Sequence, residues 1–189
     1  MKIKPTGKPG RVVVEIDSED EQLLENVGRR AKTTSAFELK KVLVPIDFSE
    51  CSKKALHYAI AFAKQFNASL TLMHVVHINY GFGEFAAIDY PLLEKQVREG
   101  TEKRLAELVT EEIGESLTAD TLVYTGVASR EIVEAARSLE CDLIIMSTHG
   151  HTGLKHVMLG STTENVVRHA PCPVLVVREN EHEFITHHN

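Results

Sequence analysis

The sequence predicts an α/β fold in which helices cover both faces of a doubly wound, five-stranded parallel sheet. From residue 40 onward, apolar runs of strand length alternate with helical patterns in the order β-α-β-α-β-α-β-α-β. The runs are continuously apolar, which is typical of parallel strands buried on both faces. A chain of 189 residues, 43% of them hydrophobic, suits one such domain with a sizeable core and an extension.

The predicted strands are short, rich in valine, leucine and isoleucine, and bounded by glycine, proline or polar residues. The first ends at a proline and an aspartate, Pro45 and Asp47. The five strands are expected at 40–47, 69–76, 118–126, 141–147 and 173–178.

Four helices are predicted between these strands, because apolar residues recur there at helical spacing. The predicted N-caps are Ser49 for the first helix and Ser129 for the third, and Asp89 and Pro91 mark the start of the second. A loop is expected at 77–89. The helices are expected at 49–66, 91–114, 129–140 and 161–170.

The first 38 residues differ in composition and are interpreted as an N-terminal extension. They begin with a Pro/Gly/Lys-rich stretch, and a strand at 12–16, a short helix and partial disorder are expected within them. The domain is then expected at 39–180, followed by a tail at 181–189.

Composition excludes several functions. A net charge of −6 without a basic patch argues against a nucleic-acid partner, and no apolar run is long enough to span a membrane. No apolar segment follows the basic start, so a signal peptide is not expected. Cys51, Cys141 and Cys172 lack CxxC spacing, which indicates free thiols and a cytoplasmic protein.

Two polar segments follow predicted strands at their carboxyl ends. Asp47 follows the first strand, and the stretch 147–166 follows the fourth. Ligands of doubly wound sheets bind outside the carboxyl ends of the strands, where the strand order reverses. If the first and fourth strands are neighbours, both segments are expected to converge on one crevice.

The stretch 147–166 has features of a phosphate-binding loop. Gly150 and Gly160 are separated by nine residues, and Ser161 and Glu164 have the spacing of a capping box at a helix N-terminus. Such an end offers free N–H donors and a positive dipole to an anion. A capped helix start and a tight turn would explain the same residues. The hydroxyls available to a phosphate are those of Ser161, Thr162 and Thr163.

Residues 40–178 resemble the universal stress protein family. The matching segments, in the order and spacing of the family, are 42–56, 72–76 and 147–178. The resemblance implies the adenine nucleotide alpha-hydrolase-like fold with strand order 3-2-1-4-5. It also implies a homodimer through the last strand, at 174–178, an apolar run expected at the sheet edge.

Members of this family that bind ATP share the pattern Gly, two residues, Gly, nine residues, Gly, then Ser or Thr. Here Gly150, Gly160 and Ser161 match, whereas Ser147 stands in place of the first glycine. A positive φ at Ser147 would cost about 1 kcal/mol or more. An extended backbone there would cost little, and its hydroxyl could donate to a phosphate.

The resemblance also assigns the remaining site residues. Asp47 matches the acidic residue that contacts the nucleoside, and the backbone of Val75 matches the adenine contact. Pro45, Met146 and His149 complete the expected site, whose ligand would be ATP, with Mg²⁺ held through its phosphates. Each also has a structural explanation: Asp47 as a helix cap, Pro45 as a strand end, Val75 and Met146 as core, and His149 as a loop residue.

Three functions remain open: a nucleotide-binding stress or signalling dimer, an interaction module with an empty or anion-filled crevice, and a slow ATPase. The sequence contains no Walker loop and no paired carboxylates near the site, so no catalytic residue is predicted. The histidines around the loop, with Cys172, lack metal-ligand spacing, so no metal site is predicted.

Overall fold

The structure is a computed structural model, and it describes residues 2–5, 12–15, 38–77, 90–148 and 159–180, together with residues 182 and 185. The chain divides into two units, Met1–Phe37 and Glu38–Asn189. Among the described residues, no helix combines the length and apolar character needed to cross a lipid bilayer.

The N-terminal unit contains a two-stranded antiparallel sheet. Strand β1 (Lys2–Pro5) pairs with β2 (Val12–Glu15), with Ile3 opposite Val14. The strand predicted at 12–16 is therefore confirmed. Strand β1 was not predicted, because its lysines and proline resemble a linker. The helix and disorder expected further along the extension fall on residues 16–37, outside the described residues.

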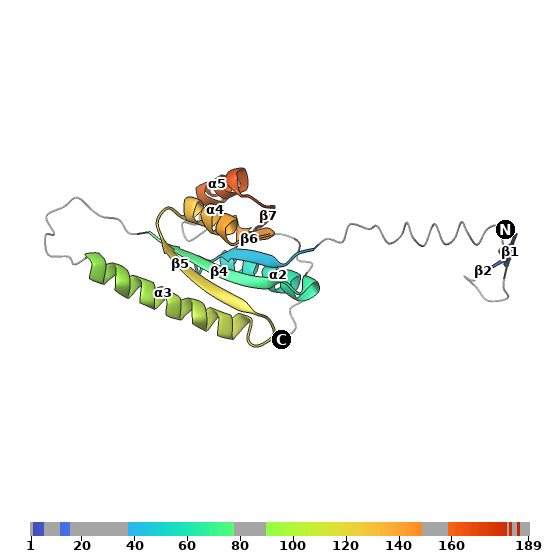
Figure 1. Ribbon diagram of the computed structural model, residues 1–189, viewed down its shortest axis with the longest axis horizontal. Coiled ribbons are helices and arrows are strands. Elements are labelled where there is room, and N and C mark those ends of the chain that lie inside the picture. Colours follow the sequence, from blue (N-terminus) through green and yellow to red (C-terminus); the bar gives the residue numbers. More distant parts are fainter. Residues whose placement is uncertain are drawn as a thin grey trace. The chain divides into compact units, whose positions relative to one another are not determined.

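The second unit contains a five-stranded parallel sheet of order β5-β4-β3-β6-β7, shown in Figure 1. Numbered within this sheet, the order is the predicted 3-2-1-4-5. Every helix and strand predicted within 40–178 is present, with ends shifted by no more than two residues. The strands are β3 (Lys41–Pro45), β4 (Ser69–Val76), β5 (Ala119–Thr125), β6 (Leu143–Ser147) and β7 (Val174–Val177).

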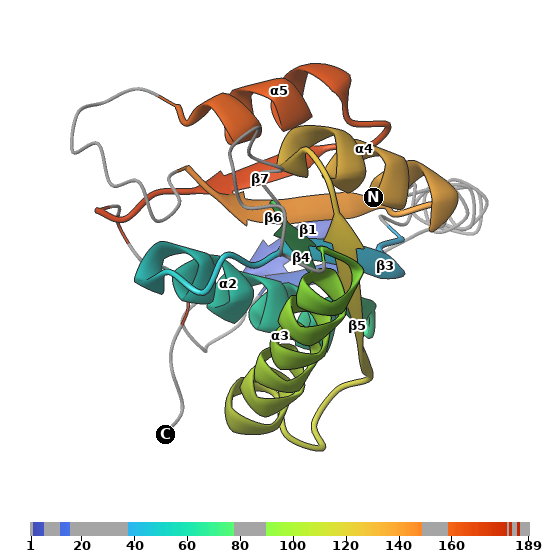
Figure 2. The same ribbon diagram turned by 90° about the vertical axis from the view of Figure 1, so that its left-hand side faces the viewer.

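Helices cover both faces of this sheet and bury a separate apolar cluster on each. Helices α2 and α3 lie on one face, and α4 and α5 lie on the other, as Figure 2 shows. The cluster beneath α2 and α3 includes Leu56, Leu72 and Leu105, and the one beneath α4 and α5 includes Met73 and Ile132. The helices are α2 (Glu50–Phe66), α3 (Tyr90–Glu112), α4 (Ala128–Ser138) and α5 (Ser161–His169).

A carboxylate fastens the central strand β3 to its neighbour β6. Oδ2 of Asp142 accepts hydrogen bonds from the backbone amides of Lys40 and Lys41, at 2.8 and 2.9 Å. The Asp142 amide in turn donates to the Lys41 carbonyl at 3.0 Å. These bonds fix the register that pairs Val42 with Leu143, and they make β3 and β6 neighbours.

One predicted helix cap is confirmed and another is wrong. Ser49 caps α2, because its hydroxyl accepts a hydrogen bond from the Ser52 amide at 3.1 Å. Ser129 does not cap α4, whose N-cap is Val127. The Glu131 amide donates to the Val127 carbonyl at 3.0 Å, so the helix begins before Ser129 and places that residue inside its first turn.

Gly126, between β5 and α4, has a conformation that other residues rarely adopt. Its φ is +156°, and a Cβ there would lie 2.7 Å from Oε1 of Glu131. We expect Gly126→Ala to lower the free energy of unfolding by about 1–2 kcal/mol, because the backbone is strained and the Glu131 carboxylate must turn away. Urea unfolding measures this change.

The control for this substitution is Gly100→Ala, in the middle of α3. A Cβ at Gly100 meets no atom within 4 Å. Because alanine has the higher helix propensity, we expect Gly100→Ala to raise the free energy of unfolding by about 0.5–1 kcal/mol. Changes of the same sign at Gly126 and Gly100 would contradict the conformation described for Gly126.

Candidate functional site

The carboxyl ends of β3, β4 and β6 and the N-termini of α4 and α5 enclose a cavity of about 440 Å³. This volume is in the range of small-molecule sites. The cavity is lined by Pro45, Ile46, Asp47, Met73, His74, Val75, His77, Ala128, Ile132, Met146, Ser147, Thr148, Gly160, Ser161, Thr162 and Thr163.

Most of the predicted site residues meet in this cavity. Asp47 and the segment that follows β6 line the same space, so the predicted convergence on one crevice is confirmed. His149 and Gly150 lie outside the described residues. The predicted residues that line the cavity are Pro45, Asp47, Val75, Met146, Ser147, Gly160, Ser161, Thr162 and Thr163.

Ser147 occupies the cavity wall without backbone strain. It is the last residue of β6, pairs with Val177 of β7, and is not among the described residues with positive φ. The amide of the next residue, Thr148, donates to the Val177 carbonyl at 2.9 Å and so continues the strand pairing. Of the two alternatives for Ser147, the extended backbone is therefore the one observed.

Hydrogen bonds join the carboxyl end of β6 to the start of α5. The Thr163 hydroxyl donates to the Ser147 carbonyl at 2.9 Å, and the Gly160 amide donates to the Thr148 carbonyl at 3.0 Å. The side chain of Thr163 is buried, with 3% exposure. The Thr163 hydroxyl therefore donates its proton within the protein, to the carbonyl at the end of β6. This bond fixes the start of α5, where Ser161 and Thr162 line the cavity.

The capping box predicted at Ser161 and Glu164 is wrong. The N-cap of α5 is Gly160, and Ser161 is already helical. Glu164 accepts instead from the guanidinium of Arg168, at 3.1 and 2.8 Å, because a helical turn brings these two side chains together. Gly160 supplies no side-chain cap. The positive end of the helix dipole therefore adjoins the cavity, as an anion site requires.

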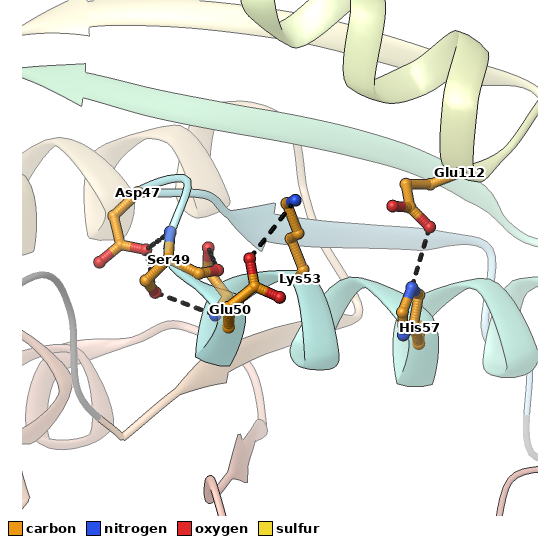
Figure 3. A network of polar contacts seen from close by, with 7 residues as sticks. Asp47, Ser49, Glu50, Lys53, His57 and Glu112 are labelled. Atoms are coloured by element: carbon orange, nitrogen blue, oxygen red, sulfur yellow. Dashed lines mark hydrogen bonds and ion pairs between the residues drawn. The ribbon is translucent and has the colours of Figure 1, made fainter.

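Asp47 lines the cavity. It also organises the start of α2, as Figure 3 shows. Its Oδ1 accepts from the amide and the hydroxyl of Ser49, at 3.0 and 2.6 Å. Asp47 therefore does not cap α2 itself but holds the residue that does. Further along α2, His57 contacts Glu112 of α3 at 2.9 Å and ties the two helices together.

The sequence identified only part of the apolar wall of the cavity, through Pro45, Val75 and Met146. Met73 and Ile132 have the side chains of ordinary core residues, so composition alone does not distinguish them. One signal was available: in a strand, residues two apart share a face, so Met73 faces the same side as Val75. The lining residues that were not predicted are Ile46, Met73, His74, His77, Ala128, Ile132 and Thr148.

The cavity therefore has two chemically different parts. One part is apolar and belongs to the cluster beneath α4 and α5, whereas the other presents hydroxyls and the N-terminus of a helix. Among the described lining residues, Asp47 is the one carboxylate, and none is lysine or arginine. This arrangement fits a ligand with a flat apolar ring at one end and an anionic group at the other.

The domain that carries this cavity matches a known protein family. The model of the universal stress protein family matches residues 38–178. The chain belongs to the universal stress protein family. Universal stress protein MJ0531 of Methanocaldococcus jannaschii is 36% identical over 146 residues, which cover 76% of this chain and 85% of that protein.

Solved structures of universal stress proteins share this fold. The structure of MJ0577, also from Methanocaldococcus jannaschii, matches with a TM-score of 0.65 and 31% identity, over 76% of this chain and 99% of the other. A universal stress protein from Archaeoglobus fulgidus, solved in complex with dAMP, matches with a TM-score of 0.52, over 74% of this chain and 97% of its own. At 16% identity, this second likeness concerns the fold alone.

Phe48, which follows Asp47, has an unusual backbone. Its φ is +64°, and Asn67 and Glu140 are the other described non-glycine residues with positive φ. Those two follow helices α2 and α4, where a left-handed residue is common. Phe48 instead precedes the N-cap of a helix. A bulky residue there stores about 1–2 kcal/mol of strain beside the cavity.

We expect Phe48→Gly to be more stable than Phe48→Ala by about 1 kcal/mol, because both lose the ring and only glycine relieves the left-handed backbone. Urea unfolding of the two variants measures the difference. Ile60, inside α2, is the control position, since there glycine should be less stable than alanine by about 1 kcal/mol. Alanine more stable than glycine at Phe48 would refute the left-handed conformation.

Proposed function

We propose that this protein binds an adenine nucleotide, preferentially ATP. We further propose that it acts as a stress-response or signalling protein whose partners distinguish its nucleotide-bound and free forms. The observation that carries the proposal is the cavity itself. Its apolar part adjoins the N-terminus of α5, and the Asp47 carboxylate lines the same cavity. Those are the three environments that a base, a phosphate chain and a sugar require.

The lining residues suggest how the nucleotide lies. The adenine ring fits between the apolar side chains of Met73 and Ile132, next to the backbone of Val75. In this orientation the Asp47 carboxylate accepts hydrogen bonds from the ribose hydroxyls. The phosphates then reach Ser161 and Thr162 at the positive end of α5. Mg²⁺ would be held by the phosphates rather than by a set of protein ligands.

A solved structure of the same fold is consistent with a nucleotide ligand. A member of the family binds dAMP, which contains the same base and a phosphate. Ser147, the residue that departs from the glycine pattern of ATP-binding members, has the extended backbone that a serine tolerates. The substitution therefore introduces no left-handed strain at the point where the phosphates would pass.

The proposal is tested by placing a negative charge where the phosphates are expected. Thr162 is half-buried in the cavity wall, in the first turn of α5. We expect Thr162→Glu to weaken Mg·ATP binding by about tenfold or more through charge repulsion. Adenosine, which has no phosphate, should bind within about twofold of wild type. Calorimetry with both ligands measures the difference.

The matched control is Thr162→Gln, which has the size of glutamate without its charge and should bind ATP more tightly than Thr162→Glu does. The glutamate is compatible with the fold, because an acidic residue in the first turn favours the helix dipole. Mass analysis of nucleotide that purifies with the wild-type protein gives independent evidence. If the wild type binds no ATP and carries no nucleotide, the proposal is wrong, and an interaction module of the same fold is favoured.

We also propose that two copies associate through β7, at residues 174–178. This strand lies at the sheet edge, and Val174, Leu175 and Val176 are only half-buried. The carbonyls of Pro173 and Val177 accept hydrogen bonds from the amides of Ile144, in β6, and Thr148, which follows β6. Because these directions alternate along a strand, Val174 and Val176 direct their N–H and C=O groups to the open edge.

We expect Val176→Pro to convert the dimer to a monomer, because proline removes an outward N–H without removing a bond to β6. Val176→Thr is the control, since it keeps both the N–H and the β-branched shape. Sedimentation equilibrium gives the mass of each. A wild-type monomer, or a dimer that persists in Val176→Pro, would contradict an interface through this edge.

A further inference from the structure

Two consecutive residues of the β3–α2 connection face opposite sides of the sheet. Asp47 lines the cavity, on the side of α4 and α5. Phe48 packs against the cluster beneath α2 and α3. Because a single peptide unit joins them, a backbone shift at Phe48 on one face would also shift the backbone of Asp47, which carries the carboxylate on the other.

The ring of Phe48 contacts two side chains from different elements. The guanidinium carbon of Arg104, in α3, is 3.9 Å from the ring centroid, which is a cation–π contact. The ring of His74, in β4, is 5.0 Å away and tilted by 40°. Arg104 therefore connects the middle of α3 to the residue that follows Asp47.

The rest of the connection is fixed by hydrogen bonds. The Ile46 amide donates to the Met73 carbonyl at 2.8 Å, and Nδ1 of His74 donates to the Ile46 carbonyl at 2.7 Å. The Asp47 carboxylate spans the turn to the Ser49 amide. Phe48, inside this frame, has the strained left-handed backbone. The contacts of its ring oppose relaxation of that strain.

We propose that Arg104 is a positioning residue for the cavity: through Phe48 it holds the Asp47 carboxylate where the ligand's sugar hydroxyls meet it. The ligand part of this inference rests on the proposed function. Loss of the Arg104 contact lets the turn relax and moves the carboxylate, so the protein loses selectivity for ligands that carry the hydroxyls. By linkage, a ligand bound to Asp47 also strengthens the attachment of α3 to the turn.

The test compares ATP with 2′,3′-dideoxy-ATP, which lacks both hydroxyls. For Arg104→Gln we expect the affinity for ATP to fall by about threefold to fivefold, as a cation–π contact of this kind predicts. The affinity for dideoxy-ATP should be unchanged, so the ratio of the two dissociation constants changes. In an Asp47→Asn background the same substitution should have no further effect on this ratio, because the group on which it acts is altered.

The control is Lys103→Gln, which removes a positive charge from the next position of α3. Lys103 is exposed and is paired with Glu107 at 3.8 Å, on the same helix. This variant should leave the ratio of dissociation constants at its wild-type value. A merely structural or long-range electrostatic role of Arg104 would instead weaken both nucleotides alike, and that result would overturn the inference.

A second measurement needs no ligand. The Ser49 amide donates to Asp47, so its hydrogen exchange reports whether the carboxylate stays in place. We expect faster exchange of this amide in Arg104→Gln and unchanged exchange in Lys103→Gln. If the wild type binds neither nucleotide, the proposed function fails, and Ser49 exchange alone decides the inference. Unchanged exchange in Arg104→Gln, or an unchanged affinity ratio where ATP binds, overturns it.

Discussion

The pairing of β3 with both β4 and β6 is the constraint on which the rest of the domain depends. It places the first strand of the sheet in its centre, so the chain leaves β3 toward one face and leaves β6 toward the other. The bonds of the Asp142 carboxylate to the Lys40 and Lys41 amides fix this pairing at the amino ends. At the carboxyl ends the two connections diverge, and the space between them is the cavity.

The wall of the cavity is assembled before any ligand arrives. Thr163 is bonded to the Ser147 carbonyl, Gly160 to the Thr148 carbonyl, and Ser49 to Asp47. Each bond uses a polar group of the protein to position a neighbouring one. A ligand that enters therefore meets groups already in place, and little of its interaction energy goes into ordering the described part of the wall.

The sequence predicted the fold well because continuous apolar runs and helical periodicity are strong signals over many residues. It predicted the helix starts to within one residue but did not identify every N-cap, because a cap depends on the first hydrogen bond of the helix: Ser129 and Ser161 each lie within the helix that they were expected to cap. Most polar residues of the site were identified, since they follow strands. The apolar wall was identified only in part, because Met73 has the side chain of any core residue. Two further features have no signature in the sequence: the backbone angle φ of Ser147, and the hydrogen bonds by which Asp47 holds Ser49.

The two apolar clusters contribute unequally to the cavity wall. Most of the cavity wall comes from the strand ends and from the side of α4 and α5, whereas α2 and α3 face the opposite cluster. The sheet thus separates the two clusters, and at the connection 46–49 neighbouring residues face opposite sides of it. Substitutions on the exposed surface of α2 and α3 can accumulate, or create new binding surfaces there, without altering the cavity, provided that they leave this connection intact.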